Sequence, residues 1–456
     1  MDESAAPGSA SDPAQGGPAK KTLSVPGATV LGIGSMIGAG IFALLGEAGG
    51  VAGAAVWISF LLGLVVTSLL AYVCVKLGMR YPSSGGLITY MVEGFGTGRL
   101  VGIGSWLGYM AAMVIVCSMV AVSFGSYATS LFVGDDAAGW WDNVFTTALL
   151  VAMVGINLVG AKVVARAQSA IVFLVLASFA FFVVVTLPGI DPDLLSFDGY
   201  PSFSKIVASV ALTFFAYLGF NVITFTAGDL RNPSHDLPRA MTGALGITGL
   251  TYVLIAIAVF GTLTVAEVVQ FGPTAIAEAA RPSLGEFGFV LMAATAMLST
   301  AGATNATLYA SGNMTGMLAQ VGLFPSFFGA GTRLGPKAGM VLTGAVVLVV
   351  ANLVDLSAIA SVGSATALVL FLLICAAAYR LRASTGSSVV MIALATLVVL
   401  VVLLAFAIDT IRNAPQTFTA MIVIGVLAVV LDAVTRRYGS NASSGEVGLP
   451  PAPHGT

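Results

Sequence analysis

The stretch Leu31-Gly-Ile-Gly-Ser-Met-Ile-Gly-Ala-Gly-Ile-Phe42 decides the fold of this chain. It is apolar enough to lie in lipid, but four of its residues are glycines, each of which weakens a helix by about 1 kcal/mol relative to alanine. Backbone polar groups inside a bilayer must be paired, so a helix break is tolerated only inside protein or beside a cavity. The stretch therefore predicts a membrane helix that unwinds at Gly38-Ala39-Gly40 and turns free N–H groups inward. The competing interpretation is close helix packing, because Gly34 and Gly38 form a small-xxx-small pair.

The composition of the whole chain places it in a membrane. Of its 456 residues, 58% are hydrophobic and 8% are charged, whereas soluble domains carry roughly 25% charged residues. Mean hydropathy is +1.01, so lipid must form the outer solvent. The sequence contains no basic stripe for nucleic acid, and its two histidines are too few for a His-based metal or catalytic cluster. Three cysteines lie in apolar runs and are expected to be buried thiols, namely Cys74, Cys117 and Cys375.

Repeated apolar runs have the length of membrane spans. A hydrocarbon core of about 30 Å requires roughly 20 apolar residues in a helix. Such runs predict twelve transmembrane helices, near residues 27–49, 51–77, 100–125, 144–160, 169–189, 206–228, 240–265, 287–312, 338–354, 358–379, 388–408 and 418–435. The run at 144–160 is short. The two ends, 1–24 and 438–456, are rich in small residues and proline and are expected to be disordered cytoplasmic tails.

The basic residues support this count and orient the chain. With the N-terminus inside the cell, the cytoplasmic segments hold fifteen of the eighteen Lys and Arg residues. The outer segments hold only Lys205, Arg281 and Arg412. The positive-inside rule then places both ends in the cytoplasm of a multi-pass plasma-membrane protein.

A second interrupted helix is expected in the sixth span. Its sequence is Leu212-Thr-Phe-Phe-Ala-Tyr-Leu-Gly-Phe-Asn-Val222, with Gly219 in the middle of the span. Transporters built from repeats carry interrupted segments at corresponding places in two halves, and these segments flank the substrate site. The first and sixth spans correspond if the repeat unit has five helices. An odd number of helices per unit makes the second copy inverted.

Five segments in chain order resemble the amino acid–polyamine–organocation (APC) superfamily and identify the chain as an amino acid permease. They are Gly34-Ser-Met-Ile-Gly-Ala-Gly-Ile-Phe42, Arg80-Tyr-Pro-Ser-Ser-Gly-Gly86, Phe214-Phe-Ala-Tyr-Leu-Gly-Phe220, Gly228-Asp-Leu-Arg-Asn-Pro233 with Leu237-Pro-Arg-Ala240, and Asn305-Ala-Thr-Leu-Tyr309 followed by Gly322-Leu-Phe-Pro325. Each motif alone is weak, but five in the right order, on the right side of the membrane, are a strong signal. The resemblance covers residues 25 to 385.

The resemblance implies an all-α membrane protein with a LeuT-like core of two inverted five-helix repeats. The repeats would span residues 25–189 and 190–382, and two further helices would occupy 383–437. Helices one and six would be discontinuous. The resemblance also implies alternating access, which is the mechanism of a secondary active transporter.

The same resemblance implies a substrate site at the two breaks. The backbone N–H groups of Gly38, Ala39 and Gly40 would hold a carboxylate, since a helix N-terminus favours negative charge. Carbonyl groups of Met36, Phe215 and Leu218 would take an ammonium, and the Phe215 ring would cap the substrate. Further candidates for contact with the substrate are Ala216 and Asn221, in the same segment of the sixth span, and Asn305, in the eighth-span motif.

Departures from the family pattern favour a neutral substrate. Many relatives carry an acid at the positions of Leu218 and Asn221, and some carry a lysine near the position of Val175, but this chain has none of the three. Charged groups in mid-membrane mark ion coupling or cationic substrates. We therefore expect a small neutral amino acid, moved by ion-coupled uptake. The alternative within transport is a polyamine or cationic amino acid carrier.

A polar face of the eighth span is the candidate ion site. Thr300 and Thr304 are spaced four residues apart on one helical face, and Ser299 adjoins it. Hard cations take oxygen ligands, so these hydroxyls would help to bind sodium, with a proton as the other candidate coupling ion. The competing interpretation is that such hydroxyls bond their own helix or a neighbour.

Two further residues and two other function classes complete the sequence-based picture. Tyr109 and Met113 share a face of the third span and are candidates for contact with the substrate side chain, although packing explains such positions more often. The sequence contains no HExxH motif, catalytic dyad or P-loop, which argues against an enzyme. A channel or a membrane receptor is the remaining alternative from another class.

Overall fold

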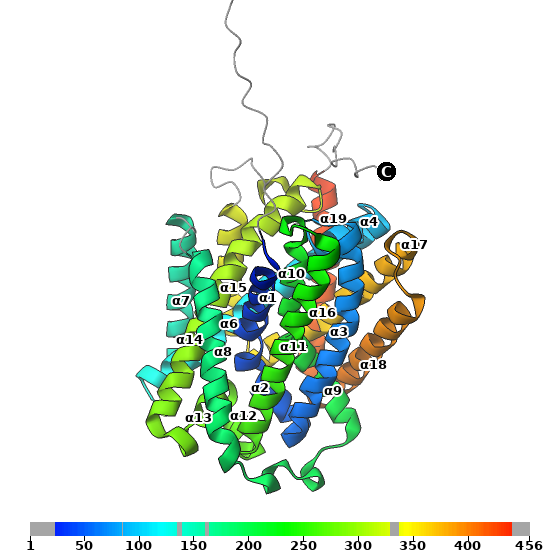
Figure 1. Cartoon of the computed structure of the whole chain (residues 1–456). Coiled ribbons are helices and arrows are strands. Elements are labelled where there is room, and N and C mark those ends of the chain that lie inside the picture. Colours follow the sequence, from blue (N-terminus) through cyan, green and yellow to red (C-terminus); the bar gives the residue numbers. More distant parts are fainter. Residues whose placement is uncertain (1–22, 84, 135–138, 160–163, 329–336, 440–456) are drawn as a thin grey trace, which may run out of the picture.

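The computed structural model describes residues 23–83, 85–134, 139–159, 164–328 and 337–439. The predicted tails, 1–24 and 438–456, fall almost entirely outside these ranges. The described residues form a bundle of helices that run between the two ends of the molecule (Figure 1). Their extended structure is limited to one isolated bridge between Leu23 and Leu230. The all-α fold is therefore confirmed.

The first and sixth predicted spans are each split. The first consists of α1 (Val25–Ala39) and α2 (Ile41–Ala52), separated at Gly40. The sixth consists of α9 (Phe203–Ala216) and α10 (Asn221–Phe225), with the 3-10 turn η7 (Leu218–Phe220) between them. Two discontinuous helices, as expected from their glycines, are thus present in the bundle.

Each of the other spans is a single helix, apart from a π-helical turn in the third and a kink at Gly285, near the start of α14. That span consists of α5 (Arg99–Tyr109), the π-turn η2 (Met110–Ile115) and α6 (Val116–Phe132). The remaining spans are α3 (Val56–Arg80), α7 (Trp140–Val159), α8 (Val164–Thr186), α11 (Pro233–Phe260), α14 (Arg281–Gln320), α15 (Lys337–Leu353), α16 (Leu356–Arg380), α18 (Val389–Asn413) and α19 (Pro415–Gly439).

Short helices connect the spans at the two ends of the bundle. At the end where α3 finishes lie α4 (Leu87–Phe95) and α17 (Arg382–Thr385) (Figure 1). At the opposite end lie η1 (Gly53–Ala55), η4 (Leu187–Gly189), η5 (Pro192–Leu195), η6 (Phe197–Gly199), α12 (Val265–Phe271), η9 (Gly272–Thr274) and α13 (Ala275–Glu278). The turns η8 (Ala227–Asp229) and η10 (Ser326–Phe328) complete the described helices.

Length and hydropathy agree with the predicted spans. Among the described residues, ten helical segments are long and apolar enough to cross a membrane, and two shorter apolar helices, Val25–Gly38 and Lys337–Leu353, add to them. One of the ten, Ile41–Arg80, joins the second half of the first span to the second span. The fourth span is longer than expected, because α7 begins at Trp140 rather than near residue 144.

The interrupted spans lie at the centre of the bundle and the last two helices lie at its edge. In the sixth span, 83% of the most apolar window is buried inside the protein, whereas for Pro415–Arg437 the share is 11%. Large apolar side chains therefore remain exposed on α18 and α19, which suits contact with lipid tails. The buried centre is where a broken helix is tolerated.

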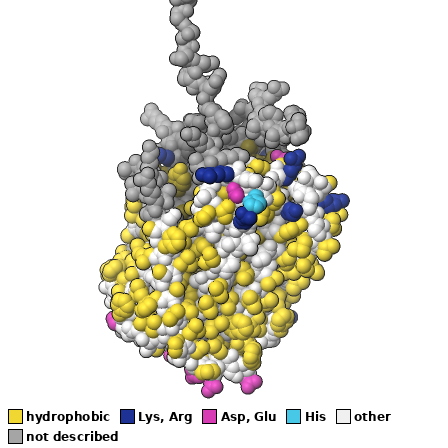
Figure 2. Space-filling model, viewed as in Figure 1, with side chains coloured by type: hydrophobic (Ala, Val, Ile, Leu, Met, Phe, Trp, Pro, Cys, Tyr) yellow, Lys and Arg dark blue, Asp and Glu magenta, His cyan; other side chains and the backbone are white. Residues whose placement is uncertain are grey.

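Basic side chains gather near one end of the bundle. Figure 2 shows Lys and Arg near one end of the visible face, with a few Asp and Glu among them and further Asp and Glu at the opposite tip. Between the two ends the same face is largely apolar (Figure 2). This distribution is the one that a bilayer around the middle of the molecule would require.

Candidate functional site

The break in the first span is confined to one residue. Helix α1 runs through Ala39, and Gly40 alone leaves helical geometry, with φ −103° and ψ −81°. The predicted unwinding of Gly38-Ala39-Gly40 is therefore wider than the one observed, and Gly38 belongs to the last turn of α1. Helix α2 then begins at Ile41 without a side-chain cap, which leaves its first turn as a positive helix end.

The break in the sixth span extends over four residues. Helix α9 ends at Ala216, Tyr217 follows it, and the tight turn η7 leads into the five-residue helix α10. The carbonyl end of α9 therefore points into the same region as the start of α2. Residues 33–43 and 213–223 contain no charged side chain. Helix ends, rather than ionised groups, provide the electrostatics of this region.

Each break packs against the backbone of the other interrupted span. A Cβ atom added to Gly219 would lie 2.4 Å from both the Met36 nitrogen and the Ser35 carbonyl carbon. A Cβ atom added to Gly40 would lie 2.4 Å from the Ala216 carbonyl oxygen. Only glycine permits these approaches, so the two breaks form one structural unit.

Both interpretations of the first-span glycines are correct at different positions. Gly40 is the break, whereas Gly38 packs closely on α14, where its added Cβ would lie 2.7 Å from the Ala303 Cβ. Close packing thus holds α1 against the eighth span directly beside the break.

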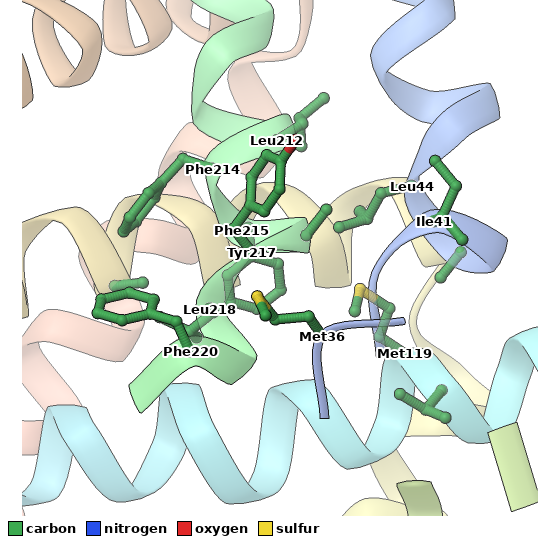
Figure 3. Packing of buried hydrophobic residues seen from close by; sticks show 14 of the residues in the cluster. Met36, Ile41, Leu44, Met119, Leu212, Phe214, Phe215, Tyr217, Leu218 and Phe220 are labelled. Carbon is green, nitrogen blue, oxygen red and sulfur yellow. The ribbon is translucent and has the colours of Figure 1, made fainter. Parts of the chain in front are cut away.

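The predicted apolar contacts of the substrate gather at this place. Met36 lies beside the turn that carries Leu218 and Phe220 (Figure 3). The Phe215 ring is buried and reaches α16, where a Cβ on Gly363 would lie 2.5 Å from its Cζ atom. The structure therefore brings together Met36, Phe215, Ala216 and Leu218 next to Gly38 and Gly40.

The third-span candidates lie at a π-helical turn. Such turns insert an extra residue into a helix and occur frequently at functional sites. Met113 lies within η2, which packs against α16 and α15, and its side chain is buried. The Tyr109 hydroxyl is 2.7 Å from the Thr343 hydroxyl on α15, so it is engaged in a contact between helices.

The two asparagine candidates are buried in different surroundings. The side-chain oxygen Oδ1 of Asn305 accepts a hydrogen bond of 2.7 Å from the side-chain amide of Asn157 on α7. This contact ties the eighth span to the fourth. Asn221 begins α10, and its backbone carbonyl accepts from the Thr224 hydroxyl at 2.6 Å. Of the two, Asn221 is the one adjacent to the breaks.

One of the three candidate ion ligands, Ser299, lines a small cavity. Its lining comes from α1, α8 and α14, namely Gly34, Ile37, Ile171, Val172, Val175 and Ser299. Ser299 and Val175 thus line the same cavity. Thr300 donates to the Ala296 carbonyl of its own helix at 2.7 Å, whereas the buried Thr304 hydroxyl has no hydrogen-bond partner among the described residues.

Sequence reasoning missed Tyr252 on α11. This side chain is fully buried, and its hydroxyl donates to the Met36 carbonyl at 2.6 Å and to the Ala216 carbonyl at 3.3 Å. The signal available in the sequence was a tyrosine in mid-span, because a buried tyrosine hydroxyl requires a polar partner. Its partners are backbone atoms on two distant segments, which no spacing rule identifies.

The sequence matches a known family over most of its length. The profile of the amino acid permease family matches residues 23–428, and the chain therefore belongs to this family. The chain is 28% identical over 368 residues to the inner membrane transport protein YbaT of Escherichia coli (strain K12), covering 81% of this chain and 85% of that protein.

Two relatives in Bacillus subtilis (strain 168) have more specific names. The methylthioribose transporter is 28% identical over 329 residues, covering 68% of this chain and 69% of that protein. The serine/threonine exchanger SteT is 28% identical over 294 residues, covering 63% of this chain and 65% of that protein. Fold, hydropathy and family together define a multi-pass membrane transporter of the APC superfamily rather than an enzyme.

Proposed function

We propose that this transporter carries a small neutral amino acid by alternating access. The observation that supports the proposal is the pair of facing helix breaks, in which the carbonyl end of α9 lies beside the start of α2 and charged side chains are absent from residues 33–43 and 213–223. A zwitterion offers one charge to a helix N-terminus and the other to helix carbonyls. Neither charge then requires an ionised side chain.

The proposed site assigns one end of the amino acid to each set of backbone groups. The carboxylate accepts from N–H groups at Gly40 and the first turn of α2, and those of Gly38 and Ala39 join when the last turn of α1 opens. The ammonium donates to carbonyls of Phe215 and Leu218, and to Met36, whose carbonyl keeps a second lone pair beside its bond from Tyr252. Asn221, Met113 and the Phe215 ring border the side chain.

The missing intramembrane charges favour a neutral substrate over a polyamine or cationic amino acid. Leu218, Asn221 and Val175 occupy the positions where charged residues would otherwise pair with an ion or a cationic substrate. The name of the serine/threonine exchanger is consistent with small neutral cargo, whereas the methylthioribose transporter shows that relatives this similar are also named for other solutes.

Coupling and orientation belong to the same proposal. Uptake is driven by a proton or sodium gradient, with Ser299, Thr300 and Thr304 as the candidate ion ligands. Both chain ends face the cytoplasm, because the end of the molecule rich in Lys and Arg is the one at which α19 finishes (Figures 1 and 2).

Reconstitution of the full chain into liposomes tests the proposal. We expect saturable uptake of L-alanine, L-serine or L-threonine that responds to an imposed proton or sodium gradient. L-Arginine, putrescine and methylthioribose are the comparison solutes, and uptake of any of these in preference to the neutral amino acids contradicts the substrate assignment. If uptake occurs only when the liposomes are preloaded with amino acid, the protein is an exchanger and is not coupled to an ion gradient. If a bilayer recording shows conductance that does not saturate, the protein is a channel.

A further inference from the structure

Tyr252 contacts both interrupted spans beside the proposed substrate site. It lies on α11, and its side chain is fully buried. Its hydroxyl donates to the Met36 carbonyl at 2.6 Å and reaches the Ala216 carbonyl at 3.3 Å. One hydroxyl therefore touches the last turns of α1 and α9.

The partners of this hydroxyl are the backbone groups that a helix break leaves unpaired. Met36 and Ala216 lie in the last turns of α1 and α9, whose final four carbonyls have no partner within their own helix. Each helix C-terminus also carries a partial negative charge of about half an electron. Bringing two such ends together is unfavourable unless a proton lies between them, and Tyr252 supplies that proton.

Packing fixes the position of the Tyr252 ring. Its centroid lies 5.5 Å from the Phe60 ring on α3 and 4.9 Å from the Tyr217 ring at the sixth-span break. The Tyr217 hydroxyl binds a different backbone group, because it donates to the Phe60 carbonyl at 3.2 Å. The two neighbouring tyrosines are thus alike in burial and ring contacts but differ in which carbonyls they bind.

We propose that Tyr252 is a positioning residue for substrate binding, which ties the two helix breaks together without touching the substrate. Because its hydroxyl is hydrogen-bonded to both the Met36 and the Ala216 carbonyls, it fixes the distance between the backbone groups that bind the two ends of the amino acid. It also links α1, α9 and α11 to one another at the breaks. This inference rests on the proposed function, since it concerns the same site.

The variant Tyr252→Phe removes the hydroxyl and keeps the ring, and Tyr217→Phe is the matched control. We expect Tyr252→Phe to weaken the binding of neutral amino acids by about ten-fold, as expected when buried carbonyls lose their donor. The control is expected to stay within two-fold of the unmodified protein. Binding is measured on purified, monodisperse protein with L-alanine, L-serine and L-threonine, so that loss of folded protein does not count as loss of affinity.

Hydrogen–deuterium exchange provides a second measurement that needs no ligand. Tyr252→Phe should speed exchange at residues 36–44 and 214–220 together, whereas Tyr217→Phe should leave residues 36–44 unchanged. If exchange at residues 36–44 is unchanged in Tyr252→Phe, the proposed link between the two breaks is wrong. Equal affinity losses in the two variants overturn the positioning role. If the unmodified protein binds none of the three amino acids, the proposed function and the positioning role both fail. Hydrogen–deuterium exchange then tests only whether Tyr252 links the two breaks.

Discussion

The two interrupted spans differ in the length of their breaks and of the helices on either side. The first is cut at a single residue, Gly40, and leaves two helices of more than two turns each. The sixth is cut over Tyr217 and a 3-10 turn, and only the short α10 follows it. In both spans a glycine allows the partner backbone to approach, namely Gly40 toward Ala216 and Gly219 toward Met36.

This difference indicates how a substrate would be oriented. Helix α2 has twelve residues and an uncapped first turn, so its aligned peptide dipoles favour an anion. Helix α10 has five residues, which sum to a much weaker dipole. In the proposed site, the carboxylate is therefore assigned to the first span and the ammonium to the carbonyl end of α9. The following predictions test this asymmetry.

Gly40→Ala should have the largest effect. The added methyl group would lie 2.4 Å from both the Ala216 carbonyl and the Tyr252 hydroxyl and 2.7 Å from the Met36 carbonyl. Displacing two backbone carbonyls costs about 3 kcal/mol, and we expect loss of uptake and a lower melting temperature. Gly246→Ala is the control, because no atom lies within 4 Å of its added Cβ. Normal transport by Gly40→Ala would contradict the assigned break.

Gly219→Ala should follow closely. Its methyl group would strike the backbone of Ser35 and Met36 from the other side of the same contact. We expect about 2 kcal/mol of destabilisation, slightly less because the short turn η7 shifts more easily than a full helix. Thermal unfolding and amino acid binding check this expectation. If Gly219→Ala retains affinity while Gly40→Ala loses it, the two breaks do not act as one unit.

The packing glycine of the first span should have a smaller effect that can be reversed. Gly38→Ala would place its methyl group 2.7 Å from that of Ala303 and should cost about 1 to 2 kcal/mol. The double variant Gly38→Ala/Ala303→Gly exchanges the methyl group between the helices and should recover most of the lost melting temperature. A double variant as unstable as the sum of the two single changes would show that the two positions are independent.

The Asn157–Asn305 pair tests whether Asn305 acts on the substrate or on helix packing. Hydrogen bonds between membrane helices contribute about 0.6 to 2 kcal/mol. Because their side chains bond each other, we expect Asn157→Ala and Asn305→Ala to lower stability by similar amounts and to leave affinity unchanged. A loss of affinity in Asn305→Ala alone would place Asn305 at the substrate, as the sequence suggested.

The smallest effect is expected at Glu267 in α12. Hydrogen bonds from the Thr264 hydroxyl and backbone N–H, each 2.8 Å, lower the pKa of this carboxyl group at the start of α12. A lowered folded-state pKa stabilises the protein above the unfolded-state value near 4.3 and loses that stabilisation as the pH falls further. Melting temperatures between pH 7 and pH 3 should show a slightly shallower decline in Glu267→Gln, and an identical decline would mean that this cap contributes nothing.

The sequence predicted the elements of the site better than their contacts. Gly40 and Gly219 were identified from their place in apolar runs, because glycine in mid-span is costly unless a break or close approach requires it. The width of the first break was overestimated, since spacing alone does not show that Ala39 still closes the last turn of α1. The pairing of Asn305 with Asn157 was missed because these residues lie 148 positions apart.

By itself the sequence determined that the protein lies in a membrane, how many times it spans that membrane, and where two of its helices break. Hydropathy, charge asymmetry and helix propensity are local properties of the chain, so these features follow from its residues alone. Only the tertiary structure decided that Gly219 rests on Met36 and that one tyrosine hydroxyl reaches both breaks. Those contacts depend on how distant helices pack, and the reach of a side chain across the bundle leaves no periodic signal.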